Sequence, residues 1–187
     1  MMKRCADLTF ALCAAIVLVA PMIFIAFAVK ITSRGPALYW SRRAGRNGTY
    51  FMMPKFRTMR IDTPEVATDK LLNPNQYLTP VGSFLRRTSL DELPQLLSVM
   101  RGDMSIVGPR PALHNQYELI ARRNALGIDI LRPGITGWAQ INGRDEIDLD
   151  NKLRLDREYL KHQSLYFDVK ITIVTILAVM RSRGVTH

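Results

Sequence analysis

Two adjacent carboxylates, Asp91 and Glu92, follow a pair of arginines, Arg86 and Arg87, at the predicted start of a helix. A carboxylate at a helix N-terminus beside guanidinium groups is expected to stay ionised at neutral pH. An ionised Asp can attack phosphorus and form an acyl phosphate, and the neighbouring cations would bind a diphosphate. A second carboxylate beside the first suits Mg²⁺. The four residues therefore predict phosphoryl transfer, with Asp91 and Glu92 as candidate metal ligands.

The same carboxylates also have a purely structural interpretation. Ser89 and Glu92 fit the capping-box pattern, in which the Glu side chain only satisfies a backbone donor at the helix start. A weaker signal, Asp148 and Asp150, resembles the Asp-x-Asp metal motif of nucleotide-sugar glycosyltransferases. As a lone three-residue match opening a charged helix, it predicts solvated side chains.

Arg110 lies between two prolines, Pro109 and Pro111. Prolines restrict the local backbone, so the guanidinium can be presented with little loss of entropy, as bidentate phosphate binding requires. The alternative is a stiff loop that binds no ligand. Further along, residues 132–143 are rich in Gly and Pro, and glycines there would let the backbone approach a ligand closely.

The N-terminal segment from Leu8 to Ile31 is almost entirely apolar, with Lys3 and Arg4 before it and Arg34 after it. Pro21 in its middle removes a backbone donor and is expected to break the helix. Each half would then be roughly 15–20 Å long, too short to cross a ~30 Å hydrocarbon core. Basic residues at both ends favour a cytoplasmic location for both. These residues alone leave a re-entrant hairpin and a kinked spanning helix equally open.

The remaining composition limits the class of protein. The chain has 187 residues, enough for one compact domain. Its net charge of +10 predicts an anionic partner: nucleic acid, anionic lipid or a phosphorylated substrate. No nucleic-acid recognition motif supports the first of these. Cys5 and Cys13 are expected to be buried without a disulfide, and the three histidines have no metal-ligand spacing.

The elements that would position these residues indicate an α+β fold, a mostly helical single domain with a small β-hairpin. Asn47-Gly48 between two aromatic-rich runs predicts the hairpin turn. The last helix either lies in the membrane interface, with Val169, Ile173, Ile176 and Met180 facing lipid, or packs in the core. Helices are expected over about 79–85, 91–100, 112–124, 149–162 and 165–180, a loop over 62–75, and irregular backbone or short strands over 132–143.

Taken together, the motifs resemble the monotopic polyprenyl-phosphate phosphoglycosyl transferases of the bacterial sugar transferase family, in particular its small members. The resemblance covers essentially the whole chain. It rests on the residue runs at 3–7 (KRCAD), 55–59 (KFRTM), 89–95 (SLDELPQ), 102–105 (GDMS), 109–111 (PRP) and 132–138 (RPGITGW).

This resemblance implies a membrane topology. Residues 1–34 would form a re-entrant membrane helix broken at Pro21, and residues 35–187 a catalytic domain with amphipathic helices at the membrane interface. Both termini would be cytoplasmic, on the inner membrane of a bacterium. One local departure concerns the break itself, where Ala20 precedes Pro21 and small members often have Ser.

The resemblance also implies a reaction. Asp91 would attack a UDP-sugar and release UMP, and polyprenyl (undecaprenyl) phosphate would then take the phosphosugar from Asp91. Glu92 would hold Mg²⁺ or assist the acceptor. This would be the first membrane step in the assembly of an O-antigen, capsule, exopolysaccharide or glycoprotein glycan. The residues assigned to phosphate binding are Lys55, Arg86, Arg110 and Arg144, and Arg57 and Asp156 are candidates for a supporting role.

A second hypothesis from a different class is a non-enzymatic membrane scaffold that binds anionic lipid or glycan-assembly proteins. It accounts for the charge and the amphipathic helices but leaves the Asp91–Glu92 pair unexplained. Candidate partners are a UDP-sugar, polyprenyl phosphate, membrane lipids, a second copy of the chain and downstream glycosyltransferases, with no nucleic acid. The residues do not identify the sugar.

Overall fold

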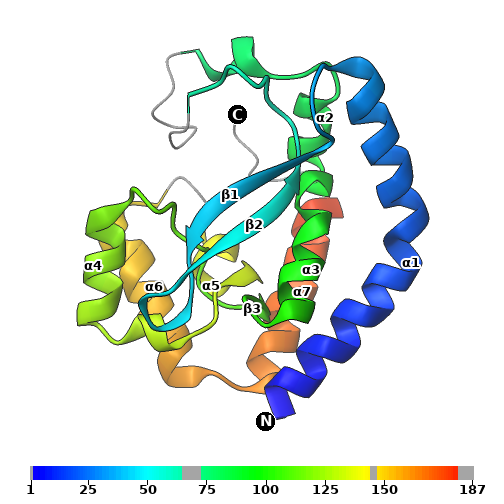
Figure 1. Ribbon diagram of the computed structural model, residues 1–187. Coiled ribbons are helices and arrows are strands. Elements are labelled where there is room, and N and C mark those ends of the chain that lie inside the picture. The colour runs from blue at the N-terminus through cyan, green and yellow to red at the C-terminus, as the bar shows by residue number, and fades with distance from the viewer. Residues whose placement is uncertain (1, 65–72, 144–146, 181–187) are drawn as a thin grey trace.

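The computed structural model describes residues 2–64, 73–143 and 147–180 and confirms the α+β class. Helix α1 (Met2–Thr32) runs along one side of the molecule (Figure 1). The strands are β1 (Leu38–Ala44), β2 (Tyr50–Phe56), β3 (Ser105–Val107) and β4 (Gly134–Thr136). The remaining α-helices are α2 (Gly82–Arg87), α3 (Leu96–Arg101), α4 (Tyr117–Ala125), α5 (Trp138–Ile141), α6 (Leu149–His162) and α7 (Leu165–Met180). Short 3₁₀ helices are η1 (Arg46–Gly48), η3 (Pro74–Tyr77), η4 (Leu90–Gln95) and η5 (Ile128–Ile130).

Helix α1 is continuous through Pro21, so the expected break is a bend and not an interruption. Figure 1 shows the bend about midway along the helix. Pro21 removes one i→i−4 hydrogen bond, and the intact bonds on either side hold both halves in helical geometry. Within the described residues, α1 is the one helix that is long and apolar enough to cross a membrane.

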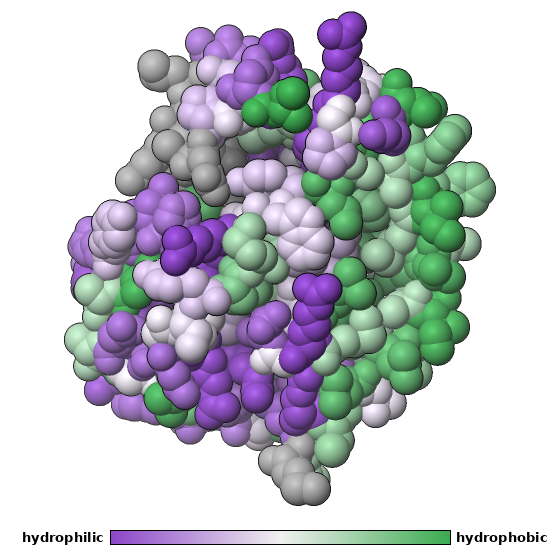
Figure 2. Space-filling model, viewed as in Figure 1, coloured by the Kyte–Doolittle hydropathy of each residue, from purple (hydrophilic) through white to green (hydrophobic). Residues whose placement is uncertain are grey.

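Most of the surface of α1 is exposed, although it is apolar. Only 6% of its most apolar window is buried inside the protein, and Figure 2 shows apolar residues gathered along this side of the molecule. Cys5 and Cys13 are exposed on it, so the prediction that they are buried is wrong. Within α1 the buried residues are Asp7, Ala11 and Val29, so the helix contacts the rest of the protein along one narrow face. Cys5 and Cys13 lie outside that face. A surface of this kind indicates an apolar environment around α1.

Strands β1 and β2 form the predicted antiparallel hairpin. The loop between them, residues 45–49, contains the 3₁₀ turn η1, and Asn47 and Gly48 in it both have positive φ, which these two residue types adopt most easily. The register pairs Tyr39 with Lys55 and Ser41 with Met53. Side chains alternate along a strand, so Lys55 and Met53 lie on the same face of the hairpin. That face directs Lys55 toward η4, which packs on β2.

Strands β3 and β4 form a small parallel pair at the centre of the molecule, in a region predicted only as irregular backbone or short strands. A Cβ atom at Gly134 would lie 2.1 Å from the backbone nitrogen of Gly108, and one at Gly137 would lie 2.1 Å from the Gly108 carbonyl oxygen. These glycines therefore permit close backbone packing between two chain segments, and not the predicted approach to a ligand. The short helix α5 that follows was not predicted.

The start of one helix differs from the prediction for a reason that the contacts show. Helix α4 begins at Tyr117, five residues later than expected, because Ala112 and Leu113 pair with the edge of β1 instead. Helices α6 and α7 have the predicted ranges. Asp148 and Asp150 are exposed, which confirms the prediction that these side chains are solvated. Asp148 also caps α6 by accepting from the Asn151 backbone nitrogen at 2.8 Å.

Helix α7 combines the two alternatives that the residues left open. Ile171 is fully buried in the core, whereas Val169, Ile173 and Ile176 are each at least half exposed. Trp138 packs on Phe167 of the same helix with ring centroids 4.9 Å apart. One face of α7 is thus a core face and the other is an exposed apolar face. The side chain of Met180 lies outside the described part of the chain.

Candidate functional site

The two carboxylates of interest lie on η4, where an ordinary helix start was expected. Pro94 cannot donate to the carbonyl of Leu90, so this turn is 3₁₀ and the α-helical geometry of α3 starts only at Leu96. Ser89 precedes it in the left-handed region (φ 56°) and its side chain makes no capping hydrogen bond. The capping-box interpretation is therefore wrong, and Glu92 is available for other contacts.

Glu92 binds the two cations that flank it. The Lys55 Nζ atom lies 2.7 Å from Glu92 Oε1, and Arg110 Nη2 lies 3.3 Å from the same oxygen. Burial alone would raise the pKa of Glu92, but Lys55 and Arg110 outweigh it and hold the pKa at about 2. Glu92 is thus a permanent anion that fixes both cations in place.

Asp91 is more buried than Glu92, with 7% of its surface exposed. Burial raises the pKa of Asp91 from 3.8 to about 6, and the neighbouring Glu92 adds to this effect. Lys55, Arg86 and Arg110 act in the opposite direction and keep the rise moderate. At neutral pH the carboxylate is therefore mostly ionised yet poorly solvated, as the nucleophile in a phosphoryl transfer should be.

Arg86 and Arg57 are held by other parts of the protein. Arg86 donates from Nε to Thr58 Oγ1 at 3.1 Å and contributes to the electrostatic field at Asp91. Arg57 is buried and donates to the backbone carbonyls of Ser33 and Arg34 at the end of α1. Its predicted supporting role is therefore to anchor α1, away from any phosphate. Arg144 lies outside the described residues.

Asp156 is connected to the site through Arg123, by three hydrogen bonds. Its Oδ2 atom accepts from Nε and Nη2 of Arg123, at 3.1 and 2.7 Å, and Arg123 Nη1 donates to the backbone carbonyl of Arg110 at 2.8 Å. Arg43 supports the same loop by donating to the Pro111 carbonyl at 3.1 Å. Asp156 thus positions Arg110 from a distance.

A small pocket lies beside Glu92 and is open to solvent. Sequence reasoning predicted Lys55, Glu92 and Arg110 among its lining residues but missed Arg43 and Gln95. Arg43 could have been found from the hairpin register, which puts it on the same face as Lys55. The pocket is lined by Arg43, Met53, Lys55, Glu92, Gln95, Arg110, Pro111 and Gly134.

The site therefore places a buried carboxylate, Asp91, next to Glu92 and to a cluster of cations that lines a small pocket. A family model described as bacterial sugar transferase matches residues 1–182. The chain belongs to the bacterial sugar transferase family.

Several relatives of this bacterial sugar transferase carry names that state an activity or a pathway. It is 40% identical over 185 residues to UDP-glucose:undecaprenyl-phosphate glucose-1-phosphate transferase of Escherichia coli, covering 94% of this chain and 39% of that protein. It is 35% identical to undecaprenyl-phosphate galactose phosphotransferase of Salmonella typhimurium, covering 98% and 41%. It is 38% identical to exopolysaccharide production protein ExoY of Rhizobium meliloti, covering 98% and 88%. The chain thus spans about two-fifths of the two transferases and most of ExoY.

Proposed function

We propose that this bacterial sugar transferase moves a sugar 1-phosphate from a UDP-sugar to undecaprenyl phosphate, as the first membrane step in assembling a glycan. The observation that carries the proposal is the contrast within the Asp91–Glu92 pair. One carboxylate is buried with a raised pKa, and the other is locked between Lys55 and Arg110. The names of relatives that act on undecaprenyl phosphate support the same substrates.

The reaction follows from these groups in two displacements. A carboxylate oxygen of Asp91 attacks the sugar-bearing phosphorus of the UDP-sugar, the bond from that phosphorus to the oxygen of the other phosphate breaks, and UMP leaves. A phosphate oxygen of undecaprenyl phosphate then attacks the same phosphorus. The bond to Asp91 breaks, which regenerates the carboxylate and gives undecaprenyl-diphosphate sugar. Lys55 and Arg110 stabilise the negative charge that develops on the phosphoryl oxygens in both steps.

The carboxylate pair also fits Mg²⁺. This ion is commonly held by one or two carboxylates together with substrate phosphates, and the described residues contain no group of three potential metal ligands. Asp91 and Glu92 would provide the protein ligands. When bound, Mg²⁺ would neutralise diphosphate oxygens and stabilise the leaving UMP.

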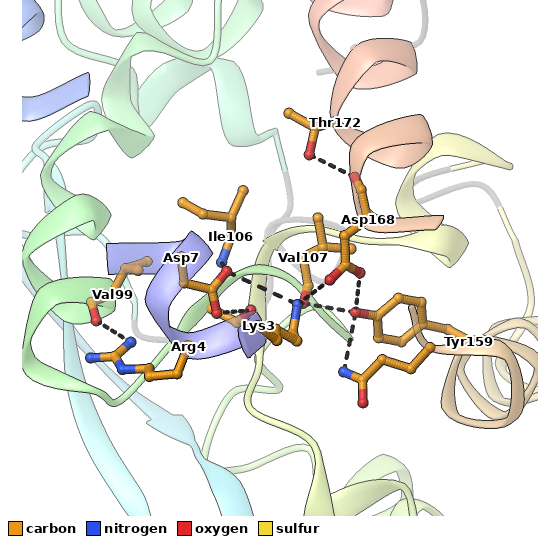
Figure 3. Close-up of polar contacts among 11 residues, drawn as sticks. Lys3, Arg4, Asp7, Val99, Ile106, Val107, Tyr159, Asp168 and Thr172 are labelled. Carbon is orange, nitrogen blue, oxygen red and sulfur yellow. Dashed lines mark hydrogen bonds and ion pairs between the residues drawn. The ribbon is translucent and has the colours of Figure 1, made fainter. Parts of the chain in front are cut away.

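The attachment of α1 supports a re-entrant topology. Near the start of α1, Lys3 donates to Asp168 of α7 at 2.6 Å, and Asp7 accepts from Ser105 Oγ at 2.8 Å and from the Ile106 backbone nitrogen at 3.1 Å (Figure 3). At the other end, Arg57 binds the carbonyls that follow the helix. One catalytic domain, residues 35–187, therefore holds both ends of the membrane element, residues 1–34.

A helix that crossed a bilayer would carry its ends to opposite sides, where one small domain cannot bind both. At 1.5 Å per residue the 31 residues of α1 extend for roughly 46 Å, which is long enough to cross a ~30 Å hydrocarbon core. The proposed topology therefore follows from the binding of both ends to one domain, and not from the length of the helix. We infer that the bent helix dips into one leaflet of the bacterial inner membrane and that both termini lie on the cytoplasmic face. The site then meets its lipid substrate at the bilayer surface.

The test is a product assay with purified protein, short polyprenyl phosphate and a panel of UDP-sugars. We expect release of UMP, and a labelled phosphosugar trapped on the protein when the acceptor is omitted. Asp91→Asn should abolish both, whereas the exposed control Asp62→Asn should leave both unchanged. Release of UDP in place of UMP, or substantial turnover by Asp91→Asn, would rule out this mechanism. A membrane scaffold would release neither nucleotide.

A further inference from the structure

Gln95, the last residue of η4, has a buried side chain in the active-site pocket. Only 2% of its surface is exposed, and it lines the pocket together with Lys55, Glu92 and Arg110. No side-chain hydrogen bond of Gln95 is found among the residues that the structure describes, and its amide is not one of the fully enclosed polar groups that lack a partner. The small exposed part of Gln95 therefore belongs to the amide and faces the pocket, where a ligand can satisfy its hydrogen bonds.

The local helix geometry explains why Gln95 faces the pocket. In a 3₁₀ helix, side chains three residues apart lie above one another, so Gln95 projects to the same side as Glu92. Pro94 enforces this geometry because it has no N–H for an α-helical bond. In a regular α-helix the two side chains would diverge by about 60°. The proline in this motif thus directs the amide and the carboxylate into one pocket.

The other polar groups of the pocket already have partners. Lys55 binds Glu92, and Arg43 donates to Ser41 Oγ and to the Pro111 carbonyl. Arg110 also contacts Glu92, and its backbone carbonyl is held by Arg123. Gln95 is therefore the lining residue whose two N–H donors are uncommitted. The ligand that satisfies them must bring oxygen acceptors into a pocket with three cations.

We propose that Gln95 is a substrate-binding residue whose carboxamide nitrogen donates to a non-bridging oxygen of the phosphoryl group that is transferred. The inference rests on the proposed function, which places that phosphorus beside Asp91, four residues earlier on η4 and next to Glu92 in the chain. A neutral amide adds hydrogen bonds to the phosphoryl group without adding charge to a site that already holds Arg43, Lys55 and Arg110. Because the contact is to the phosphoryl group, it is common to every sugar.

The experiment compares Gln95→Met and Gln95→Glu with the wild-type protein in the UMP-release assay. We expect Gln95→Met to lower kcat/KM by roughly 10- to 100-fold, the usual effect of losing a hydrogen bond to a charged substrate group. We expect Gln95→Glu to lower it at least as much, since its carboxylate repels phosphate. The loss should be the same for UDP-glucose, UDP-galactose and UDP-N-acetylglucosamine.

Thermal unfolding separates this role from a structural one. Methionine has nearly the same length and needs no hydrogen bond, so Gln95→Met should keep or raise the Tm while lowering activity. The control Gln76→Met, at an exposed position on η3, should match wild type in kcat/KM.

Three results would overturn the inference. They are wild-type kcat/KM in Gln95→Met, a Tm that falls in parallel with activity, or a loss that differs sharply between the three sugars. The last result would move the contact to a sugar hydroxyl. Failure of the proposed function has a separate signature, which is the absence of UMP release by the wild-type protein on any UDP-sugar.

Discussion

Asp91 and Glu92 are adjacent in the chain, yet their pKa values shift in opposite directions. Asp91 loses water and has no direct ion pair within the described part of the chain, whereas Glu92 gains two cations that compensate for its burial. Sequence alone could not separate their roles, since both are acidic residues near the same arginines. This contrast supports the proposal that Asp91 is the nucleophile, while Glu92 holds Lys55 and Arg110 in place.

This difference predicts the pH dependence of the reaction. The nucleophile must be ionised, so kcat/KM for the UDP-sugar should fall as pH drops through about 6, the pKa of Asp91 in the free enzyme. Lys55 is the strongest of the charges that lower this pKa, so Lys55→Met should move the acidic limb to higher pH as well as reduce the rate. A pH profile of UMP release measures both. An acidic limb near pH 4, unchanged by Lys55→Met, would contradict the prediction.

The same pKa predicts a trade-off between activity and stability. A carboxyl whose folded-state pKa is raised favours the folded state below its unfolded pKa of 3.8, and this contribution is lost as pH rises through about 6. The neutral Asp91→Asn should therefore be inactive but more stable than wild type at pH 8, by about 2 kcal/mol. The gain should disappear near pH 4. Thermal unfolding at both pH values checks the sign.

At the scale of elements, helices α4 and α6 act on the site through the loop between β3 and α4. Arg123 and Asp156 form a buried ion pair, and Arg123 also holds the Arg110 carbonyl. Arg123→Met should be destabilised by about 3 kcal/mol or more, because it leaves Asp156 buried without a partner. Adding Asp156→Leu should restore most of the stability. It should not restore UMP release, because the hydrogen bond to Arg110 is still missing. Recovery of both properties together would show that the pair acts only on folding.

Arg57, just after β2, links this strand to the residues that follow α1. Arg57, two residues after Lys55, is buried and binds Ser33 and Arg34. We expect Arg57→Met to lower stability by about 2 kcal/mol and to reduce UMP release, since charged hydrogen bonds are lost next to the strand that carries Lys55. The matched variant is Arg60→Met. The exposed guanidinium of Arg60 pairs with Asp62, and its loss should change stability by less than about 0.5 kcal/mol. Thermal unfolding in one detergent compares the two variants directly.

At the scale of the whole molecule, the prediction concerns the side of the membrane on which each end of α1 lies. Cys5, near the start of α1, and a cysteine introduced by Asp62→Cys should react with a membrane-impermeant maleimide from the same side of sealed vesicles. Cys13, further along the apolar helix, should react from neither side, although it is exposed on the isolated protein. Labelling of Cys5 and of position 62 from opposite sides would show that α1 crosses the bilayer.

The order of motifs along the chain was enough to predict the α+β class, the hairpin at Asn47-Gly48, the ranges of α6 and α7 and the carboxylate pair. These features depend on local preferences: turn residues with positive φ, apolar periodicity, and charge near a helix start. The family resemblance marked Lys55 and Arg110 in the same way, from short runs of neighbouring residues.

What remained required contacts between residues far apart in the chain. The bend of α1 through Pro21, the glycine packing between β3 and β4, and the relay from Asp156 to Arg110 depend on how separate elements meet. The pKa of Asp91 belongs to this group too, because burial and charge at one atom are sums over neighbours from several segments. Local sequence therefore specified which residues could do chemistry, and only packing decided which of them meet, which are ionised and which hold the others in place.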